Sequence, residues 1–558
     1  MRASIATCRP TGVICFFVVG AALLGDARIC AQVTQTESPR AQAEHTGKQE
    51  ENYTLHVKSD LVVLDVVVTD SKGQPVSGLT KNDIRVYEND VPEQIVSLQG
   101  TGYDDAGIRQ TVAVDSTAEL DEKEPDAPVS IIVLDELTTT FEDRYFARYS
   151  LEKYLANQGE TLQQPIMLVA RNLKHMMQLQ DFTTSKRELL TAVQNHLAGN
   201  DWQAKDPDNA SDQFVTAFAS LIELAEATQG HRGHKNVIWI GRGFPELHWQ
   251  GIPDGQQEAL RAAIADCTNI LRDSRITLYT VEPGGLATSS ELTMNSDGEF
   301  DFSEKSGGQV DFEAIAQATG GQALHGRNDV DRMIGTSLRN GSNFYTLSYR
   351  PAPGSQDEKP NQFRKIRVVP VNSGYIATTR TGYFSGGSSD DLIQGDKAGL
   401  TNTSGADGMS PKERFDLAAA CNGLMVFDGI SLKIVRDEHA PNLYHVSFPA
   451  GQLGLIENDK TAAGDVKLLL LGYDSRGKLI HSTGQSIHIR LPQGSSEEDR
   501  MVTLNATVDM PPTVARVRVV VRANNSGRLG ADNVFLAERN TLKDPATGVK
   551  ASEGPKVR

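Results

Sequence analysis

Between residues 129 and 350 the sequence alternates short apolar runs with longer segments of helical periodicity. The runs VSIIVLD, PIMLVARN, MMQLQDF, KNVIWIG and RITLYTVEP are typical of strands, and the first is apolar enough to be buried on both faces. The segments between them include FEDRYFARYSLEKYLANQ and DQFVTAFASLIELAEATQG, which repeat apolar residues at helical spacing. Strands that alternate with helices predict an α/β fold built on a mostly parallel sheet.

Two further regions show the alternation of half-buried strands instead. From Tyr53 onward, strands are expected at 61–68, 84–87 and 94–98, with a turn at 71–73. This predicts a small β module at 53–100. Seven short alternating segments between Leu417 and Ala537 predict a β-sandwich-like domain at 413–538.

The remaining boundaries follow from composition and from the length of 558 residues, which is too long for one compact core. Residues 32–52 are expected to be a disordered leader, 101–128 a linker, 385–412 a flexible linker and 539–558 a disordered tail. The segments NFYTLSYRP, FRKIRVVPV and YIATTRTGYF are expected to close the α/β domain, which then runs over 129–384. A fragment of 129–384 is expected to fold alone.

The first 31 residues have the pattern of a secretory signal peptide. Arg2 and Arg9 precede an apolar run, and small residues surround a cleavage point near Ala31. The apolar run is too short and too interrupted to span a membrane, so the mature chain is expected to be secreted or periplasmic, without a membrane span. Cleavage leaves only Cys267 and Cys421, which cannot form a disulfide framework.

The composition also limits the partners. The net charge of −17 argues against nucleic acid, which rewards basic patches. The sequence contains no C-x-x-C, H-E-x-x-H or G-x-S-x-G motif.

An aspartate ends the first strand, and three threonines follow at 138–140. In open α/β sheets, ligands bind just beyond the carboxyl ends of the strands. Asp135 and the threonine hydroxyls are oxygen ligands of the kind that Mg²⁺ prefers. The same carboxylate could equally accept backbone N–H bonds from the helix that starts near Phe141, and so could the threonines.

Several ordered blocks resemble the von Willebrand factor A-related (VWFA-related) domain family of secreted acidobacterial proteins. They are DLVVLDVVVTDSKGQPVSGLTKNDIRVYENDVPEQI, FARYSLEKYL, IAQATGGQAL and the closing YTLSYRP, FRKIRVVPV and TRTGYF. The resemblance covers residues 53–384, roughly three-fifths of the chain. It implies a von Willebrand A-like, Rossmann-type fold: a doubly wound sheet with helices on both faces.

The wider group binds ligands through a metal-ion-dependent adhesion site (MIDAS), which uses D-x-S-x-S after the first strand and an aspartate after the fourth. Asp135 and Thr139 match, but Leu137 replaces a serine and Gly241 stands where the aspartate is expected. We therefore predict a degenerate MIDAS with no bound metal and no cofactor. If an ion binds, the prediction is Mg²⁺ or Mn²⁺ on Asp135 and Thr139. Otherwise, Asp135 is expected to be a cap.

A catalytic interpretation has less support. Asp135 and Leu137 occupy the positions of the two aspartates in the D-x-D-x-T loop of haloacid-dehalogenase-like phosphatases, and leucine cannot carry a proton. His231 and His234 are expected to lie solvated in a surface loop, without a third metal ligand nearby. We expect no catalytic residues and no enzymatic activity.

The sequence thus predicts an exported protein-interaction or adhesion module that binds a protein or cell-surface ligand. Two alternatives stay open. One is a structural or assembly component of a cell-envelope complex, and the other is a hydrolase with an unrecognised site.

Overall fold

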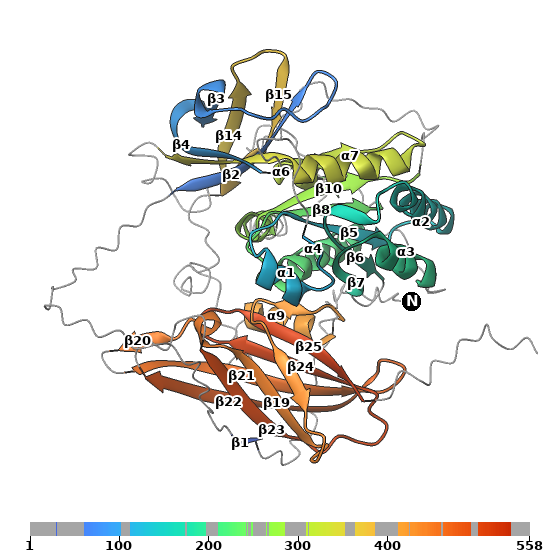
Figure 1. The fold of residues 1–558 in the computed structure, drawn as a ribbon, viewed down its shortest axis with the longest axis vertical. Coiled ribbons are helices and arrows are strands. Elements are labelled where there is room, and N and C mark those ends of the chain that lie inside the picture. The colour runs from blue at the N-terminus through green and yellow to red at the C-terminus, as the bar shows by residue number, and fades with distance from the viewer. Residues whose placement is uncertain are drawn as a thin grey trace, which may run out of the picture.

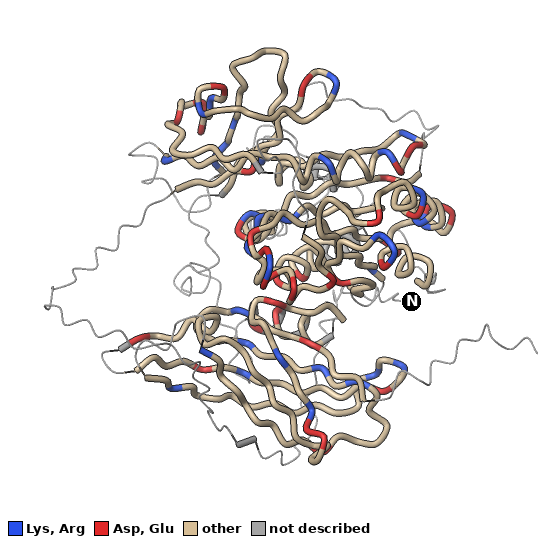
Figure 2. Tube along the Cα trace, viewed as in Figure 1, with Lys and Arg blue, Asp and Glu red and all other residues tan. Residues whose placement is uncertain are grey.

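The computed structural model describes residues 29–30, 61–101, 112–172, 176–196, 210–241, 243, 247–248, 264, 267–284, 309–310, 312–351, 363–384, 411–422, 424–458, 461–492 and 500–536. The predicted leader and tail lie outside these residues, as do residues 1–28 of the predicted signal peptide and 385–410 of the second linker. The described parts form an α/β layer in the middle, a β module above it and a β-sandwich below it (Figure 1). Acidic and basic residues occur in all three (Figure 2).

The central six-stranded sheet has the strand order β12-β10-β8-β5-β6-β7. In chain order its strands are β5 (Val129–Asp135), β6 (Thr161–Arg171), β7 (Met176–Ser185), β8 (Lys235–Ile240), β10 (Ile276–Val281) and β12 (Ala323–Leu324). All neighbours are parallel except β6 and β7. Every residue of β5, β8 and β10 is buried, as the apolar run predicts for β5. The doubly wound, mostly parallel sheet expected from the sequence is present.

Helices cover both faces of this sheet because successive strand residues point in opposite directions. Ile132 and Leu134 pack with α2 (Phe141–Ala156), α3 (Lys186–Asn195) and α7 (Val330–Ser342). Ile131 and Val133 pack on the other side with α4 (Ala210–Ala227) and α6 (Phe312–Ala318). A separate two-stranded ribbon pairs β9 (Leu247–His248) with β11 (Gln309–Val310).

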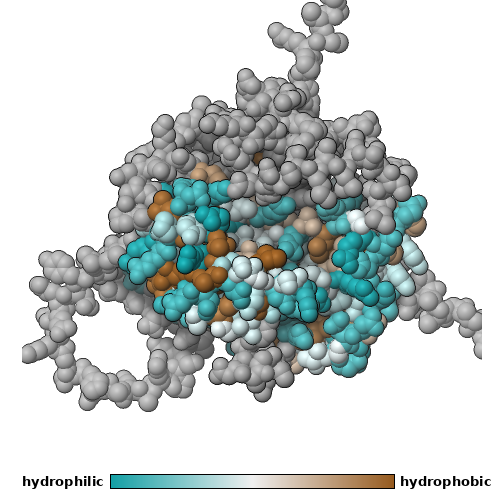
Figure 3. All heavy atoms as spheres, turned by 90° about the horizontal axis from the view of Figure 1, so that it is seen from above, coloured by the Kyte–Doolittle hydropathy of each residue, from teal (hydrophilic) through white to brown (hydrophobic). Residues whose placement is uncertain are grey.

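The β module is a seven-stranded antiparallel sheet of order β15-β2-β13-β4-β3-β14-β16. Its early strands are β2 (Val62–Asp70), β3 (Ile84–Glu88) and β4 (Val91–Thr101), with a 3-10 turn η1 (Lys81–Asp83). Its late strands are β13 (Phe344–Arg350), β14 (Phe363–Pro370), β15 (Tyr375–Thr378) and β16 (Gly382–Phe384). Seen from above, apolar residues are grouped among polar ones on the described surface (Figure 3).

This sheet corrects the predicted boundary between the β module and the α/β domain. The closing strands do not extend the α/β sheet, because β13 pairs with both β2 and β4. Leu64, Leu347 and Tyr349 share one buried core. The α/β domain is therefore inserted into the β module, between β4 and β13. The sequence did not indicate this pairing, because the paired residues of β2 and β13, such as Asp65 and Thr346, lie about 280 residues apart.

The predicted linker at 101–128 is also more structured than expected. Its described part, 112–128, contains helix α1 (Thr117–Lys123), which Ser116 caps by accepting a hydrogen bond from the Glu119 N–H. Leu120 is completely buried and Val114 is 1 % exposed, both in the core beneath the central sheet.

The C-terminal part contains two sheets packed face to face, as expected for a sandwich. One has the order β1-β23-β19-β18 and the other β17-β25-β24-β21-β20, with β22 paired to β21. The strands are β1 (Ile29–Cys30), β17 (Phe427–Asp428), β18 (Lys433–Arg436), β19 (Leu443–Pro449), β20 (Ile456–Asn458), β21 (Thr461–Tyr473), β22 (Leu479–Pro492), β23 (Met501–Thr507), β24 (Arg516–Ala523) and β25 (Leu529–Phe535). Helix α9 (Pro411–Asn422) precedes them, and η3 (Ala450–Leu453) follows β19.

The sandwich and the α/β domain share a core. Tyr473, Val520 and Leu529 from the sandwich belong to the same buried cluster as Phe182 and Leu221 of the α/β domain. Helix α9 contacts both α4 and the strands β24 and β25. The two parts are thus joined by apolar packing as well as by the chain.

Candidate functional site at the carboxyl edge of the sheet

The loop after β5 lies where the strand order reverses. β5 is followed by β6 on one side and paired with β8, after a crossover, on the other. A crevice at such a switch point is the usual ligand site of open α/β sheets. Asp135 ends β5 and Gly241 follows β8, and a Cβ built on Gly241 would lie 2.5 Å from the Asp135 Cβ. The two loop ends therefore meet here.

The Asp135 carboxylate is completely buried and surrounded by donors. Oδ1 accepts from the backbone N–H groups of Leu137 (3.1 Å) and Thr138 (3.3 Å), and from Arg171 Nη1 (3.1 Å). Oδ2 accepts from Thr138 Oγ1 (2.6 Å), Trp239 Nε1 (3.1 Å) and the backbone N–H of Gly243 (3.2 Å). A carboxylate offers about four lone-pair sites, so six donors occupy all of them.

Arg171 supplies the positive charge of this cluster. It ends β6, next to β5, and only 1 % of its side chain is exposed. Its Nε donates to Ser220 Oγ at 3.1 Å, and its guanidinium lies 5.2 Å from the centre of the Trp239 ring. Burial lowers the pKa of Arg171 and Asp135 opposes that shift, but an arginine stays protonated in proteins.

The cap of α2 is one of the three threonines, as expected for them, and not Asp135. Thr140 is the N-cap of α2, and its hydroxyl accepts from the Asp143 N–H at 3.3 Å. Asp135 instead closes a tight turn onto Leu137 and Thr138, before the helix begins. Its role is to join three strand ends through Arg171, Trp239 and the segment after β8.

The residues at the MIDAS positions do not fit a divalent cation. Arg171 already places a cation against Asp135, and a second one would be repelled. The Thr139 hydroxyl is buried without a hydrogen-bond partner in the described part of the chain. A Cβ at Gly241 would lie 2.6 Å from Thr139 Oγ1, so an aspartate has no room there. Within the described ranges, no group of three or more His, Cys, Asp or Glu side chains could hold a metal.

Beside this cluster, Glu136 is linked to the end of α3. Its Oε1 lies 2.6 Å from His196 Nε2, and each side chain is 9 % exposed. Arg148 of α2 donates to the carbonyls of His196 and Gln194, both at 2.8 Å. The pair thus ties the β5–α2 loop to α3. Its partners lie 60 residues apart, and no local motif indicates it.

Exposed aromatic residues begin directly behind the loop. Phe141, Tyr145 and Tyr149 of α2 are 63 %, 70 % and 54 % exposed. Their spacing of four places them on one face of the helix, pointing away from the core that Ala147 and Leu151 enter. We call these three side chains the α2 aromatic stripe. The sequence showed this helical spacing, but it did not indicate that the three side chains would be exposed.

The two histidines of the GHRGHK loop are buried, which corrects the expectation of a solvated surface loop. His231 is 1 % and His234 4 % exposed. His231 Nε2 lies 2.7 Å from the Ala127 carbonyl oxygen, and His234 Nδ1 lies 2.8 Å from Asp65 Oδ2 of the β module. His234 and Arg275 hold the pKa of Asp65 well below its usual value, although burial alone would raise it.

The same loop contacts the C-terminal sandwich. The Gly230 N–H donates to Asp428 Oδ1 at 2.6 Å, and Lys235 Nζ donates to the carbonyls of His231 (2.5 Å) and Ser274 (3.0 Å). Burial raises the pKa of Asp428 to about 7 and lowers that of Lys235 to about 8. Residues 230–235 therefore join all three parts of the molecule, and we call them the junction loop.

No family model and no curated protein sequence matches this chain. Among solved structures, an aerotolerance-related membrane protein from Bacteroides fragilis NCTC 9343 is similar over 38 % of this chain and 98 % of its own, at 11 % identity and a TM-score of 0.24. The VWA domain of SpRpn10 is similar over 28 % of this chain and 89 % of its own, at 14 % identity and a TM-score of 0.15. At TM-scores this low, neither similarity supports an inference about function.

The described helices include none that is both long and apolar enough to cross a membrane.

Proposed function

We propose that this chain is an exported protein-interaction module of the VWFA-related kind, which binds its partner without a metal ion. The observation that supports it best is the Asp135 cluster. At the usual ligand edge of the sheet, the carboxylate is already neutralised by Arg171 and saturated with donors. This supports binding that does not use a shared cation, through another surface at the same edge.

The α2 aromatic stripe is the surface at this edge that best suits a protein partner. Tyrosine and other aromatic residues are enriched at the centres of protein interfaces, because they bury large areas at a small entropic cost. Three of them stand exposed on one helix that starts six residues after Asp135. Acidic residues lie beside them at Glu142 and Glu152, and these would form a polar rim.

The sequence features that support export are the charged start, the apolar run and the small residues near Ala31. N-terminal sequencing of the protein from the periplasm or the medium tests this part. We expect a mature chain that begins near Gln32, and an intact N-terminus would contradict it.

The binding function is tested by affinity capture from the envelope of the exporting cell. We compare the wild-type chain with F141A/Y145A/Y149A and with a control, V371A/I376A/F535A, whose three side chains are exposed elsewhere by 53 %, 58 % and 65 %. A genuine partner should be retained by the wild type and the control in EDTA, and lost from the stripe variant. Retention by the stripe variant, or loss of the partner in EDTA, would contradict the proposal.

The alternative function, a structural component of an envelope complex, is favoured by the junction loop and by the core shared between the α/β domain and the sandwich. Parts that are held in fixed positions relative to one another would suit a structural component of a larger complex. Under this alternative the chain would co-purify with a partner in fixed stoichiometry, and the partner would not dissociate on dilution.

A further inference from the structure

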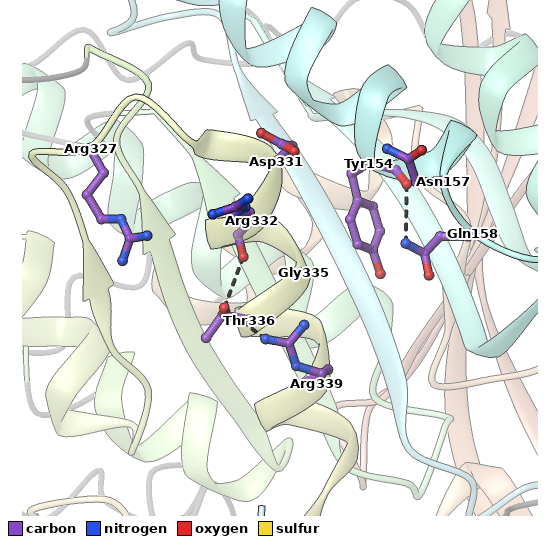
Figure 4. Close-up of a pocket in the computed structure, with 9 residues that line it drawn as sticks. All are labelled: Tyr154, Asn157, Gln158, Arg327, Asp331, Arg332, Gly335, Thr336 and Arg339. Carbon is purple, nitrogen blue, oxygen red and sulfur yellow. Dashed lines mark hydrogen bonds between the residues drawn. The ribbon is translucent and has the colours of Figure 1, made fainter. Parts of the chain in front are cut away.

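A polar hollow of about 440 Å³ lies between the end of α2 and helix α7. Arg327, Arg332 and Arg339 lie along one side of it, and Tyr154 of α2 faces them from the other (Figure 4). Such a volume is within the range of small-molecule sites. The lining is polar and arginine-rich, which disfavours an apolar ligand.

The shape of the hollow depends on a glycine. A Cβ on Gly335 would lie 3.1 Å from the Tyr154 ring, so the absent side chain lets the ring pack closely against α7. Arg332 and Arg339 stand seven residues apart on α7, on either side of this contact. Seven residues are about two helical turns, or roughly 10 Å, so the two side chains can approach a ligand from its two ends.

The charge of the hollow is opposite to that of the whole chain. Three arginines line it against one aspartate, Asp331, whose carboxylate lies 3.1 Å from Lys153 Nζ. Arg327 is paired with Asp329 through two short hydrogen bonds. The hollow thus stays positive in a chain of net charge −17.

Two of the guanidinium groups have spare hydrogen-bonding capacity. Arg339 donates to Thr336 Oγ1 at 3.2 Å, and among the residues that the structure describes no carboxylate is within ion-pair distance of it. Arg332 approaches Asp329 only to 4.0 Å, and its side chain is 80 % exposed. Surface arginines of this kind usually pair with a neighbouring carboxylate, but here the nearby carboxylates are taken by Arg327 and Lys153.

We propose that this hollow binds an anion with at least two charged groups, of phosphate or carboxylate chemistry, held between Arg332 and Arg339. The planar fork of each guanidinium matches two oxygens of a phosphate or carboxylate. The Tyr154 hydroxyl faces the same hollow and offers a further donor. Burial raises the pKa of Tyr154, which keeps this hydroxyl protonated at neutral pH. The site is distinct from the Asp135 cluster and does not depend on the proposed partner.

Equilibrium dialysis of the full-length protein with pyrophosphate, at constant ionic strength, tests this site. We expect saturable binding of one pyrophosphate per chain. Citrate should compete if carboxylates are accepted, and its failure to compete would restrict the site to phosphates. Orthophosphate, with one charged group, should bind at least about tenfold more weakly.

The variants separate a built site from general attraction. R332Q/R339Q should lower the affinity about tenfold or more, whereas R332K/R339K should fall between it and the wild type, because lysine keeps the charge but loses the fork. The control R85Q/R490Q removes two exposed arginines from the β module and the sandwich, and should bind like the wild type. Equal loss in both glutamine variants, or no saturable binding to the wild type, would overturn the proposal.

Discussion

Arg171 Nη1 lies 3.1 Å from Asp135 Oδ1, and neither side chain has more than 1 % of its surface exposed. The pair connects the carboxyl ends of β5 and β6. In a metal-dependent adhesion site a cation would balance a carboxylate at this position. Here a guanidinium from the neighbouring strand does so, and its geometry is fixed by Ser220 and Trp239.

Removing one partner of this pair should destabilise the fold strongly. Asp135→Asn leaves Arg171 as a buried cation without its counter-charge, and Arg171→Met leaves the carboxylate. Each should cost about 3–5 kcal/mol, more than the loss of a helix cap. Chemical unfolding of both single variants and of D135N/R171M gives the coupling free energy between Asp135 and Arg171. The double variant should cost clearly less than the sum of the two single variants, and simple additivity would contradict the pairing.

Gly241 should not tolerate a side chain. Its φ is +148°, and a Cβ would meet Asp135 Cβ and Thr139 Oγ1 at 2.5 and 2.6 Å. Gly241→Ala should therefore cost at least about 2–3 kcal/mol. Gly73→Ala is the matched control, because Gly73 also has a positive φ but open space around it, and only backbone strain of about 1–2 kcal/mol is expected. Similar losses in both variants would show that the space at Gly241 is not restrictive.

The Asp428 contact should make stability fall as the pH rises from about 4 to 7. Its pKa is raised from 3.8 to about 7 in the folded chain, mainly by burial, so over this window the folded state holds a proton that the unfolded state has released. Unfolding measured at pH 5 and pH 7 should show a loss of at least about 1 kcal/mol in the wild type.

Asp428→Asn should reduce that pH dependence, because the amide oxygen can still accept from Gly230 while no charge is buried. Asp126→Asn, at an aspartate whose side chain is 76 % exposed, is the control and should leave the slope unchanged. The pKa of Lys235 is lowered to about 8, so its deprotonation makes stability rise with pH, but only above about pH 8. If the free energy of unfolding of Asp428→Asn falls with pH as much as that of the wild type, Asp428 is not the cause of the pH dependence.

The fragment 129–384 should fail to fold alone. It contains β13–β16 without β2–β4, which leaves the core faces of Tyr345, Leu347 and Tyr349 without partners. A fragment of 61–536 contains all described parts except β1 and should be soluble and monodisperse. Size-exclusion chromatography of both fragments checks this, and a well-behaved 129–384 would contradict the inserted topology.

The sequence predicted what depends on local patterns. The apolar run at 131–134 predicted a strand buried on both faces, and all of β5 is buried. The alternation of strands with helices predicted a mostly parallel sheet, which is present. The aspartate at the strand end correctly marked the switch point, where Asp135 meets the segment after β8.

The parts that were missed depend on long-range contacts. Arg171 is 36 residues from Asp135, and the only local sign of it was a charge at the end of the apolar run PIMLVAR. His234 pairs with Asp65 from 169 residues away, so a loop of polar residues was interpreted as surface. The pairing of the closing strands with the β module was missed for the same reason. Alternation of apolar and polar residues indicates a strand, but it does not indicate which strand lies next to it.

If Arg171 neutralises Asp135, the folded chain should gain no stability from a divalent metal ion. The test is thermal unfolding of the full-length chain in EDTA and in about 10 mM Mg²⁺ or Mn²⁺, with Na⁺ at matched ionic strength. An ion that binds only to the folded state must raise the melting temperature. At about 10 mM, any site of millimolar affinity or better would raise it measurably. We expect no shift in melting temperature between these conditions, either for the wild type or for Asp135→Asn, although the variant should unfold at a lower temperature in all of them. A metal-dependent rise in the wild type that is lost in Asp135→Asn would contradict it and make this loop a metal-ion-dependent adhesion site.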